Sequence, residues 1–490
     1  MKFENYKILI IVLLSAFCQQ RLNVFAEDAE PSRTAERIFE NDPLTRDANV
    51  GVLVVDAETG EIIDSYRERH LLPTASTMKV ITTATALELL GGDYRWSTFL
   101  ETDGTIENGI LHGDLYIRGT GDPTLGSQKI GDKAFLRKWV KAIKEQGITQ
   151  IDGAVIADMS AFDNGDALNG GWLWEDAGNY YGMGVFSLNY LDNTMNIVLR
   201  SRAIGTIADV VSTEPKVDGV QFENHIRCTE ITYDGAYVHG VPFDDKRVLT
   251  GSVPSNLGTF GVKGDIPNPG LLLARHFEGA LEQSGVKVKQ QATFIKVLPP
   301  HSKKRTLLYE HTSPALREVV KETNIHSNNL YAEAVFRTLG LERGNKKSYE
   351  PASILHSRAV VEQCWRQRGV NWGTTIQIDG CGLAPQNGVA PNMFVGLLKY
   401  MRGCNAYSDF YDSLPVAGES GTLRTFLYGT RLQGKVHAKS GSIAHLRAYT
   451  GYIERGNGKQ WIFSIVVNNG NGKGKVVQKT IERYLLAITE

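Results

Sequence analysis

The chain has 490 residues, of which 42% are hydrophobic and 22% are charged, a composition typical of a globular protein with two to four domains. Its 53 Lys and Arg residues are balanced by 54 Asp and Glu residues, and no long basic run occurs. Because nucleic-acid affinity depends on clustered basic side chains, this balance argues against a nucleic-acid binder.

The N-terminus has the pattern of a secretory signal. Lys2 and Lys7 precede the apolar run ILIIVLLSAF, and Ala26 offers a small residue at a plausible cleavage point. We therefore predict a signal peptide over residues 1–26 and an exported mature protein, in the periplasm, with at most peripheral membrane association. The apolar run is short for a membrane span, and an uncleaved anchor is the alternative.

Residues 49–68 predict a β-hairpin, because two apolar runs flank the turn sequence DAETG. The next stretch, LLPTASTMKVITTATALELLGG over 71–92, predicts a buried helix closed by two glycines. Positions i and i+3 share a helix face, so Ser76 and Lys79 are expected side by side at its positive end. This S-x-x-K has two interpretations. Ser76 is an ordinary helix cap, or it is a nucleophile beside a lysine base whose pKa is lowered by apolar neighbours.

The pattern changes between about 94 and 297. Short β-like runs alternate there with Gly, Asn and Asp, and the part from about 209 to 270 has little helical periodicity. Helical periodicity returns over 271–286 and in PALREVVKETNIHSNNLYAEAVFRTLG. The strands RAYTGYIER and QWIFSIVVNN and a final amphipathic helix complete the chain.

Two further motifs are candidate partners of Ser76. The first is an S-x-N over 327–329, which would otherwise cap the helix that follows it. The second is a K-S-G over 439–441, which would otherwise be a hairpin turn. The order S-x-x-K, S-x-N, K-[ST]-G in one chain is typical of the penicillin-interacting serine hydrolases.

On these motifs the chain resembles the class C low-molecular-mass penicillin-binding proteins, which are D-alanyl-D-alanine carboxypeptidases and endopeptidases. The similarity covers nearly the whole mature chain and includes GDLYIRGTGDPTL, SNNLYAEAVFRTLG, DGCGL, LPVAGESGTL and KVHAKSGS. It implies an α+β multidomain fold with a serine β-lactamase/DD-peptidase-like catalytic domain, which is an antiparallel sheet flanked by helices. A large, mostly β inserted domain would carry a smaller nested domain.

The resemblance and the change of pattern together suggest the domain limits. We assign 27–95 and 298–490 to the catalytic domain. The second domain would comprise 96–208 and 271–297, and the nested third domain 209–270.

The resemblance implies catalytic roles for Ser76, Lys79, Ser327 and Asn329. Ser76 would attack the carbonyl of the penultimate D-alanine and form an acyl-enzyme, while neutral Lys79, made easier to deprotonate by nearby Lys439, would take its proton. Ser327 would relay the proton to the departing D-alanine amine. Asn329 would hold Lys79 and the peptide carbonyl.

The resemblance also implies a binding site for the substrate's terminal carboxylate at Lys439 and Ser440. Gly441 would leave room for the substrate strand. The backbone N–H groups of Ser76 and Ser442 would form the oxyanion hole.

A further binding position is implied in the insert, within GGWLWEDAGNYYGMG. Asp176 would hold the free amino group of the diamino acid in the peptide stem, with Tyr181 stacked nearby. The alternative is that Asp176 bonds its own backbone, as aspartates in turns often do.

The chain departs from the family at one segment, where D-G-S-G-L-S-R becomes DGCGLAP over 379–385. Cys381, Ala384 and Pro385 replace two serines and an arginine that lies near the family's active-site entrance. The departure leaves substrate preference or rate open. Cys381 has no obvious neighbouring base, so we expect a structural role for it.

The chain contains no C-x-x-C or H-E-x-x-H pattern, so we expect neither a metal nor another cofactor. The expected partners are peptidoglycan stem peptides, with β-lactams as covalent inhibitors. Two alternatives remain: a β-lactamase, for which no clear E-x-x-x-N is found, and a catalytically silent peptidoglycan-binding protein. The sequence leaves the balance of carboxypeptidase and endopeptidase activity, the pairing of the cysteines and the oligomeric state open.

Overall fold

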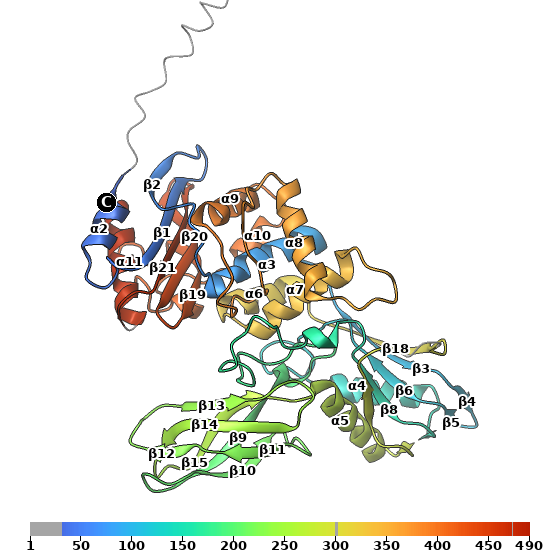
Figure 1. The fold of residues 1–490 in the computed structure, drawn as a ribbon. Coiled ribbons are helices and arrows are strands. Elements are labelled where there is room, and N and C mark those ends of the chain that lie inside the picture. The colour runs from blue at the N-terminus through green and yellow to red at the C-terminus, as the bar shows by residue number, and fades with distance from the viewer. Residues whose placement is uncertain (1–31, 299–301, 473) are drawn as a thin grey trace, which may run out of the picture.

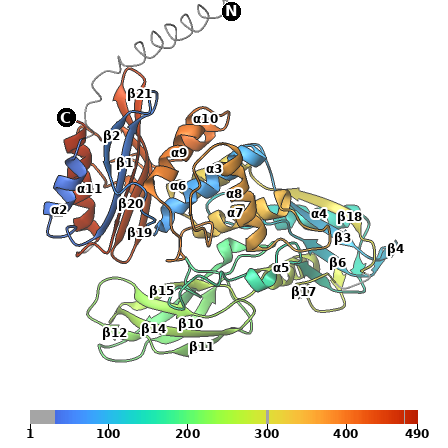
Figure 2. The same cartoon turned by 45° about the horizontal axis from the view of Figure 1, so that its top comes forward.

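The computed structural model describes residues 32–298, 302–472 and 474–490. The predicted signal peptide, residues 1–26, lies outside this described part. Among the helices of the described residues, none is both long and apolar enough to cross a membrane. Figures 1 and 2 show a helix-covered sheet built from the two ends of the chain, and further sheets built from its middle.

The sheet formed by the chain ends is antiparallel and five-stranded, in the order β19-β20-β21-β1-β2. Its strands are β1 (Asn49–Asp56), β2 (Ile62–Tyr66), β19 (Val436–Ile443), β20 (Leu446–Gly456) and β21 (Lys459–Asn468). β1 and β21 are apolar on both faces and buried along most of their length, so both faces must be covered. The helices α2 (Thr34–Asn41) and α11 (Gly474–Ile488) cover one face (Figure 1).

A helical layer covers the other face. It comprises α3 (Met78–Leu90), α6 (Leu316–Ile325), α7 (Asn329–Arg343), α8 (Ile354–Gln367), α9 (Pro391–Arg402) and α10 (Tyr407–Tyr411). The predicted nucleophile helix, α3, lies within this layer, and every residue from Met78 to Leu87 is buried. Gly91 ends α3 with a φ of 81°, a left-handed value that favours glycine.

The first part of the insert combines two sheets and two helices. The five-stranded sheet has the order β17-β8-β6-β3-β18, and the four-stranded sheet has the order β16-β7-β5-β4. The strands are β3 (Ser97–Thr102), β4 (Thr105–Glu107), β5 (Ile110–His112), β6 (Leu115–Arg118), β7 (Gln150–Ile151), β8 (Val155–Asp158), β16 (Lys287–Val288), β17 (Thr293–Ile295) and β18 (Thr306–Thr312). α4 (Phe135–Glu145) and α5 (Pro269–Gln283) pack against each other and against the larger sheet.

The second part of the insert consists of two further sheets. β10 (Asp209–Glu214), β9 (Thr194–Ser201) and β15 (Gly258–Asp265) form a three-stranded antiparallel sheet. In the other sheet, β14 (Lys246–Pro254) pairs with β11 (Gln221–Asn224), β12 (Arg227–Thr229) and β13 (Gly235–His239). The described chain also contains the 3-10 turns η1 (Ala75–Thr77), η2 (Asn164–Asp166), η3 (Leu191–Asn193) and η4 (Gly421–Leu423).

The strand pairing bears on the predicted domain limits, which remain a proposal. β9 precedes the predicted limit at 209, yet it is the central strand of the sheet with β10 and β15. β18 follows the predicted limit at 298, yet it pairs with β3 of the insert. Strand pairing therefore favours a third domain that begins near 194 and an insert that extends to about 312.

A buried ion pair ties the two sheets of the third region together. Arg247 of β14 donates from Nε to Asp265 Oδ1 at 2.6 Å and from Nη2 to Asp265 Oδ2 at 3.0 Å. The two side chains are 0% and 2% exposed, and Arg247 also donates to the carbonyl oxygens of Asp244 and Lys246. The guanidinium is therefore neutralised by a single carboxylate in a site without water contact.

We expect Asp265→Asn to lower the free energy of unfolding by about 3–5 kcal/mol, because it leaves a buried guanidinium without a counter-charge. Urea unfolding of the full chain measures this. Lys246→Gln is the matched control. It removes an exposed ion pair with Glu223 and should leave the urea concentration at the unfolding midpoint unchanged. Equal effects of the two substitutions would contradict the role of burial.

Candidate active site

Ser76 lies in η1, the turn that leads directly into α3. Lys79 Nζ donates a hydrogen bond to Ser76 Oγ over 2.9 Å, so the two side chains lie side by side as the i, i+3 spacing predicts. Ser76 is partly exposed, whereas Lys79 has no exposed surface. A hydroxyl that a substrate can reach is therefore paired with an amine that water cannot reach.

Lys79 Nζ has two further acceptors. They are Asn329 Oδ1 and the carbonyl oxygen of Cys381, each 2.7 Å away. Burial lowers the pKa of Lys79, and nearby acidic side chains act in the opposite direction. Lys79 is thus a buried, fully hydrogen-bonded amine rather than a solvated lysine of a helix surface.

Glu333 of α7 holds the segment that presents this carbonyl. Its Oε1 accepts the N–H groups of Gly380 and Cys381, both at 2.7 Å. Burial, followed by the charge of Asp379, raises the pKa of Glu333 to about 7. Glu333 therefore acts as a structural anchor for an acceptor that Lys79 needs.

Asp379 holds the following part of the same turn. Its carboxylate accepts the N–H groups of Gly382 at 2.8 Å and Ala384 at 2.7 Å, and the indole N–H of Trp172 at 2.9 Å. A Cβ on Gly382 would lie 1.8 Å from the carbonyl oxygen of Ala75, and its φ is 87°. Only glycine therefore lets this turn pack against the residue that precedes Ser76.

Glu333, Asp379 and Cys381 also place their possible metal-ligand atoms within 4.8 Å of one another. Both oxygens of Asp379 and one of Glu333 already accept hydrogen bonds from the turn. Burial raises the pKa of the Cys381 thiol well above its usual value, which disfavours the thiolate that a metal requires. These groups fit a hydrogen-bonded anchor better than a metal centre, and buried Cys381 fits the structural role expected for it.

The S-x-N motif stands at the start of α7. The helix cap is Asn328, whose side chain accepts the N–H of Tyr331 at 3.3 Å. Ser327, with a φ of 58°, lies before the helix, and its Oγ accepts a hydrogen bond from Lys439 Nζ at 3.0 Å. The capping role thus belongs to the middle residue, while Ser327 and Asn329 each contact one of the two lysines.

Lys439 is completely buried in β19. Burial, followed by the positive charge of Lys79, lowers the pKa of Lys439 well below its usual value. The sequence led us to expect that Lys439 would lower the pKa of Lys79. In the structure, burial is the largest cause of the lowered pKa of Lys79, and it is the pKa of Lys439 that the charge of the other lysine lowers.

The K-S-G strand lines a pocket of about 320 Å³ beside Ser76 and Ser327. Ser440 Oγ bonds Thr422 Oγ1 at 2.7 Å. The pocket is also lined by residues that no motif indicated, because they come from η4, β20 and α11: Thr422, Arg447, Tyr449, Lys475 and Gln478. Two of these, Arg447 and Lys475, add positive charge to the pocket of Ser440.

The structure shows a reason for glycine at position 441 that the sequence did not predict. A Cβ at Gly441 would lie 2.6 Å from the carbonyl oxygen of Thr74 and 3.2 Å from Cβ of Ala75. Glycine is therefore needed so that β19 can pass close to the turn that carries Ser76. Gly441 also lines the pocket beside Ser76, so its predicted role in leaving room for a substrate strand stays a prediction.

A second pocket, of about 740 Å³, shares Ser76 and extends toward the insert. Both predicted insert residues line it: Tyr181 hydrogen-bonds Asp176, and burial raises the pKa of Asp176. Asn329 Nδ2 donates to the carbonyl oxygen of Tyr181 at 2.8 Å, so the insert also orients the amide that contacts Lys79. Other lining residues include Ser442 and Pro385 of the altered segment. Leu173, Glu175 and Tyr180 come from the segment that the resemblance indicated, whereas Tyr237 was not indicated by the sequence.

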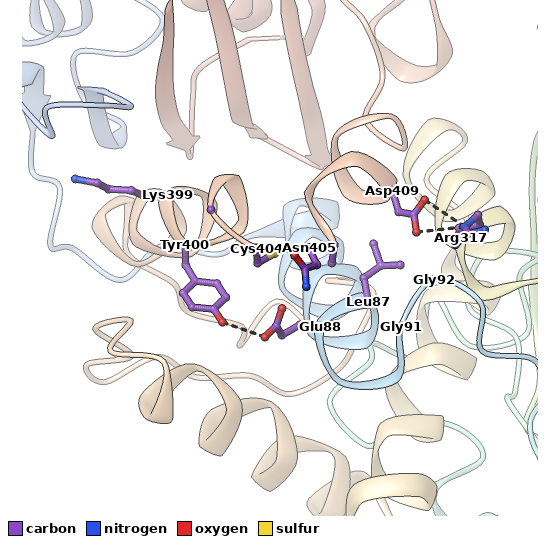
Figure 3. Close-up of a pocket in the computed structure, with 12 residues that line it drawn as sticks. Leu87, Glu88, Gly91, Gly92, Arg317, Lys399, Tyr400, Cys404, Asn405 and Asp409 are labelled. Carbon is purple, nitrogen blue, oxygen red and sulfur yellow. Dashed lines mark hydrogen bonds and ion pairs between the residues drawn. The ribbon is translucent and has the colours of Figure 1, made fainter.

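A hollow of about 860 Å³ lies at the other end of α3, away from the motifs (Figure 3). Four of its polar side chains pair with one another: Tyr400 donates to Glu88 at 3.0 Å, and Arg317 pairs with Asp409 at 3.2 Å. None of the S-x-x-K, S-x-N or K-S-G residues lines it. The candidate active site is therefore the pair of pockets that share Ser76.

Known proteins resemble this chain over most of its length. A D-alanyl-D-alanine carboxypeptidase of Actinomadura sp. (strain R39) is 29% identical over 450 residues, which cover 88% of this chain and 80% of that protein. The D-alanyl-D-alanine carboxypeptidase DacB of Haemophilus influenzae is 26% identical over 443 residues, covering 89% of this chain and 88% of that protein.

A solved structure supports the fold. The crystal structure of penicillin binding protein 4 (dacB) from Haemophilus influenzae matches with a TM-score of 0.79 and 23% sequence identity, and the match covers 94% of this chain and all of that one. The predicted α+β multidomain fold, with a DD-peptidase-like domain and a large insert, is confirmed.

The sequence pattern of one family matches residues 34–489, which is nearly all of the described chain. This match and the relatives confirm the predicted class of enzyme, a serine-type D-Ala-D-Ala carboxypeptidase. The chain belongs to the D-Ala-D-Ala carboxypeptidase 3 (S13) family.

Proposed function

We propose that this carboxypeptidase is exported to the periplasm and acts on peptidoglycan stem peptides through an acyl-enzyme on Ser76, and that it also cleaves DD-cross-links. The observation that carries the proposal is the hydrogen-bonded chain from Ser76 Oγ through Lys79 Nζ to Asn329 Oδ1. Ser327 and Lys439 form a second hydroxyl–amine pair at the same pocket. Export rests on the predicted signal peptide.

In the proposed acylation, Lys79 is neutral, so its two N–H groups donate to Asn329 Oδ1 and the carbonyl oxygen of Cys381, and its lone pair faces Ser76 Oγ. Lys79 then takes the proton of Ser76 Oγ as this oxygen attacks the carbonyl carbon of the penultimate D-alanine. The backbone N–H groups of Ser76 and Ser442 stabilise the negative oxygen that forms, and such a donor contributes about 3 kcal/mol in comparable hydrolases. The geometry supports Lys79 as the base because its amine is buried, already bonded to Ser76 Oγ, and lowered in pKa.

Collapse of the tetrahedral intermediate breaks the C–N bond to the terminal D-alanine. The proton that Lys79 took from Ser76 passes through Ser327 to the leaving amine, which returns Lys79 to its neutral form. Ser327 lies beside Lys439 and borders both pockets. Water then hydrolyses the ester on Ser76 and restores the enzyme. A β-lactam that imitates the D-Ala-D-Ala end would acylate Ser76 in the same way and leave slowly.

The 320 Å³ pocket is the proposed site for the carboxylate of the leaving group. Ser440, Arg447 and Lys475 line this pocket and suit an anion there. Lys439, which the resemblance placed at the same carboxylate, is completely buried and reaches the pocket only through its hydrogen bond to Ser327. A stem cross-linked through diaminopimelate also places a carboxylate next to the amine that departs, because the carbon that bears this amine also bears a carboxylate. One carboxylate pocket can therefore serve both the carboxypeptidase and the endopeptidase reaction.

Ser76→Ala should abolish labelling by a fluorescent penicillin and the release of D-alanine from a pentapeptide stem. The fold should persist, since a hydroxyl at a helix start contributes at most about 1–2 kcal/mol. Gel fluorescence and circular dichroism measure the two effects. A covalent adduct on Ser76→Ala would assign the nucleophile elsewhere. A wild-type chain that never labels would favour a silent binder, and rapid penicillin turnover would favour a β-lactamase.

Lys79→Ala should be nearly as damaging as loss of Ser76, because the base is removed. In the wild type, the acylation rate should fall as the pH drops below the Lys79 pKa, since a protonated amine cannot accept the serine proton. Because burial lowers this pKa, the fall should lie at lower pH than for an ordinary lysine. Rates of penicillin acylation across the pH range test both points, with Lys321→Ala on the exposed face of α6 as control. A normal rate for Lys79→Ala at neutral pH would show that another group is the base.

Asp176→Asn should slow cleavage of diaminopimelate-containing stems by roughly ten- to a hundredfold, because a charged hydrogen bond to the stem ammonium contributes about 1.5–3 kcal/mol. Acylation by simple penicillins, which lack that ammonium, should barely change. Glu175→Gln, which alters the adjacent acid in the same pocket, is the matched comparison. Equal losses on both substrates would give Asp176 a structural role, and a larger loss for Glu175→Gln would move ammonium recognition to Glu175.

A further inference from the structure

Three aromatic side chains form an exposed row beside the 740 Å³ pocket, and we refer to Trp174, His239 and Tyr237 as the ring row. The rings of Trp174 and His239 are 13° from parallel with centroids 6.0 Å apart, and those of His239 and Tyr237 are 16° from parallel with centroids 6.4 Å apart. Trp174 is 64% exposed and Tyr237 is 47% exposed. A group of exposed aromatic side chains next to a pocket is typical of a binding surface.

The ring row is held in a fixed position on the side of β13. Tyr237 and His239 alternate with the buried Val238, so their side chains leave the same face of the strand. His239 Nε2 bonds Thr250 Oγ1 of β14 at 2.9 Å, which fixes the central ring. A surface that is already ordered loses less conformational freedom when it binds a ligand.

Trp174 reaches the ring row from another part of the chain, the loop over 169–182. This loop packs tightly on β13: the Val238 N–H donates to Asn179 Oδ1 at 3.1 Å. A Cβ on Gly178 would lie 2.5 Å from the backbone nitrogen of Gly240, and the φ of Gly178 is 97°. The close approach of loop and strand, which glycine permits, is what sets Trp174 in line with the two rings of β13.

The ring row is continuous with the proposed active site. Tyr237 lines the pocket that contains Ser76, together with Leu173 and Tyr180. In peptidoglycan, a stem peptide has its D-alanine end free or cross-linked, and its amino end is joined to an N-acetylated sugar of the glycan strand. With the D-alanine end at Ser76, the amino end of the stem extends away from the nucleophile, along the pocket that borders Tyr237.

We propose that the ring row binds an N-acetylated sugar ring of the glycan strand that carries the stem peptide. The proposal rests on the proposed function and names a second part of the substrate. The C–H face of a β-linked sugar ring is apolar and uncharged, and it packs flat against an aromatic face. Trp174 and Tyr237 combine a broad apolar face with one polar atom, which suits a ring that is apolar on its faces and hydroxylated at its edge.

The test compares two substrates: a disaccharide pentapeptide and the same pentapeptide freed of its sugars. We expect the wild-type chain to cleave the disaccharide form with a kcat/KM about tenfold higher. Trp174→Ala should remove this advantage and leave cleavage of the free pentapeptide unchanged, since Trp174 does not line the Ser76 pocket. Trp174→Phe should restore much of it. Tyr349→Ala, which alters another exposed aromatic residue outside both pockets of Ser76, is the control.

Equal cleavage of the two substrates by the wild-type chain, or equal losses on both in Trp174→Ala, would overturn the proposal, and the second result would mean that the ring row contacts the peptide. Titration of the Ser76→Ala chain with a β-1,4-linked N-acetylglucosamine tetramer, followed by calorimetry, gives a readout that does not depend on catalysis. Binding that Trp174→Ala weakens by about tenfold supports the proposal, and absence of binding overturns it. If neither substrate is cleaved while the tetramer binds, the proposed reaction fails and the sugar site stands.

Discussion

The arrangement of the candidate active site follows from the burial of one amine. Lys79 Nζ has no exposed surface, and a buried polar group must find hydrogen-bond partners within the protein. Its three acceptors come from the turn before α3, from the start of α7, and from the turn over 379–384. The three hydrogen bonds of this amine therefore hold three separate segments around the Ser76 hydroxyl. The contacts that stabilise the fold here are also the contacts that position the candidate nucleophile.

The turn over 379–384 shows how much structure supports that single contact. Glu333 and Asp379 are buried acids that hold its backbone N–H groups, and Gly382 fits against the carbonyl of Ala75. Their charges also oppose the effect of burial on the Lys79 pKa. One acidic cluster thus has two consequences: it anchors the carbonyl of Cys381, and it limits how far burial lowers the pKa of Lys79.

The insert contributes residues to the candidate active site. The loop over 169–182 contacts the catalytic region through Tyr181, whose carbonyl accepts a hydrogen bond from Asn329, and through Trp172, which donates to Asp379. The same loop is bonded to β13 through Asn179. One loop therefore joins the side chains around Lys79 to the β-rich third region, and with it the ring row to the pocket of Ser76.

The features that depend on local geometry could be predicted from the sequence alone. Ser76 and Lys79 meet because residues three apart share a helix face, the hairpin over 49–68 follows from its alternating apolar runs, and the motif order indicated the family. The sequence did not reveal the roles of Glu333, Thr422, Arg447, Lys475 or Tyr237, and it did not reveal how closely Gly441 approaches the turn that carries Ser76. The acceptors of Lys79 other than Ser76 lie 250 and 302 positions away in the chain, so no local pattern records them. These contacts are visible only in the folded chain. They form when distant segments pack together and bury the amine of Lys79, which must then find hydrogen-bond partners within the protein.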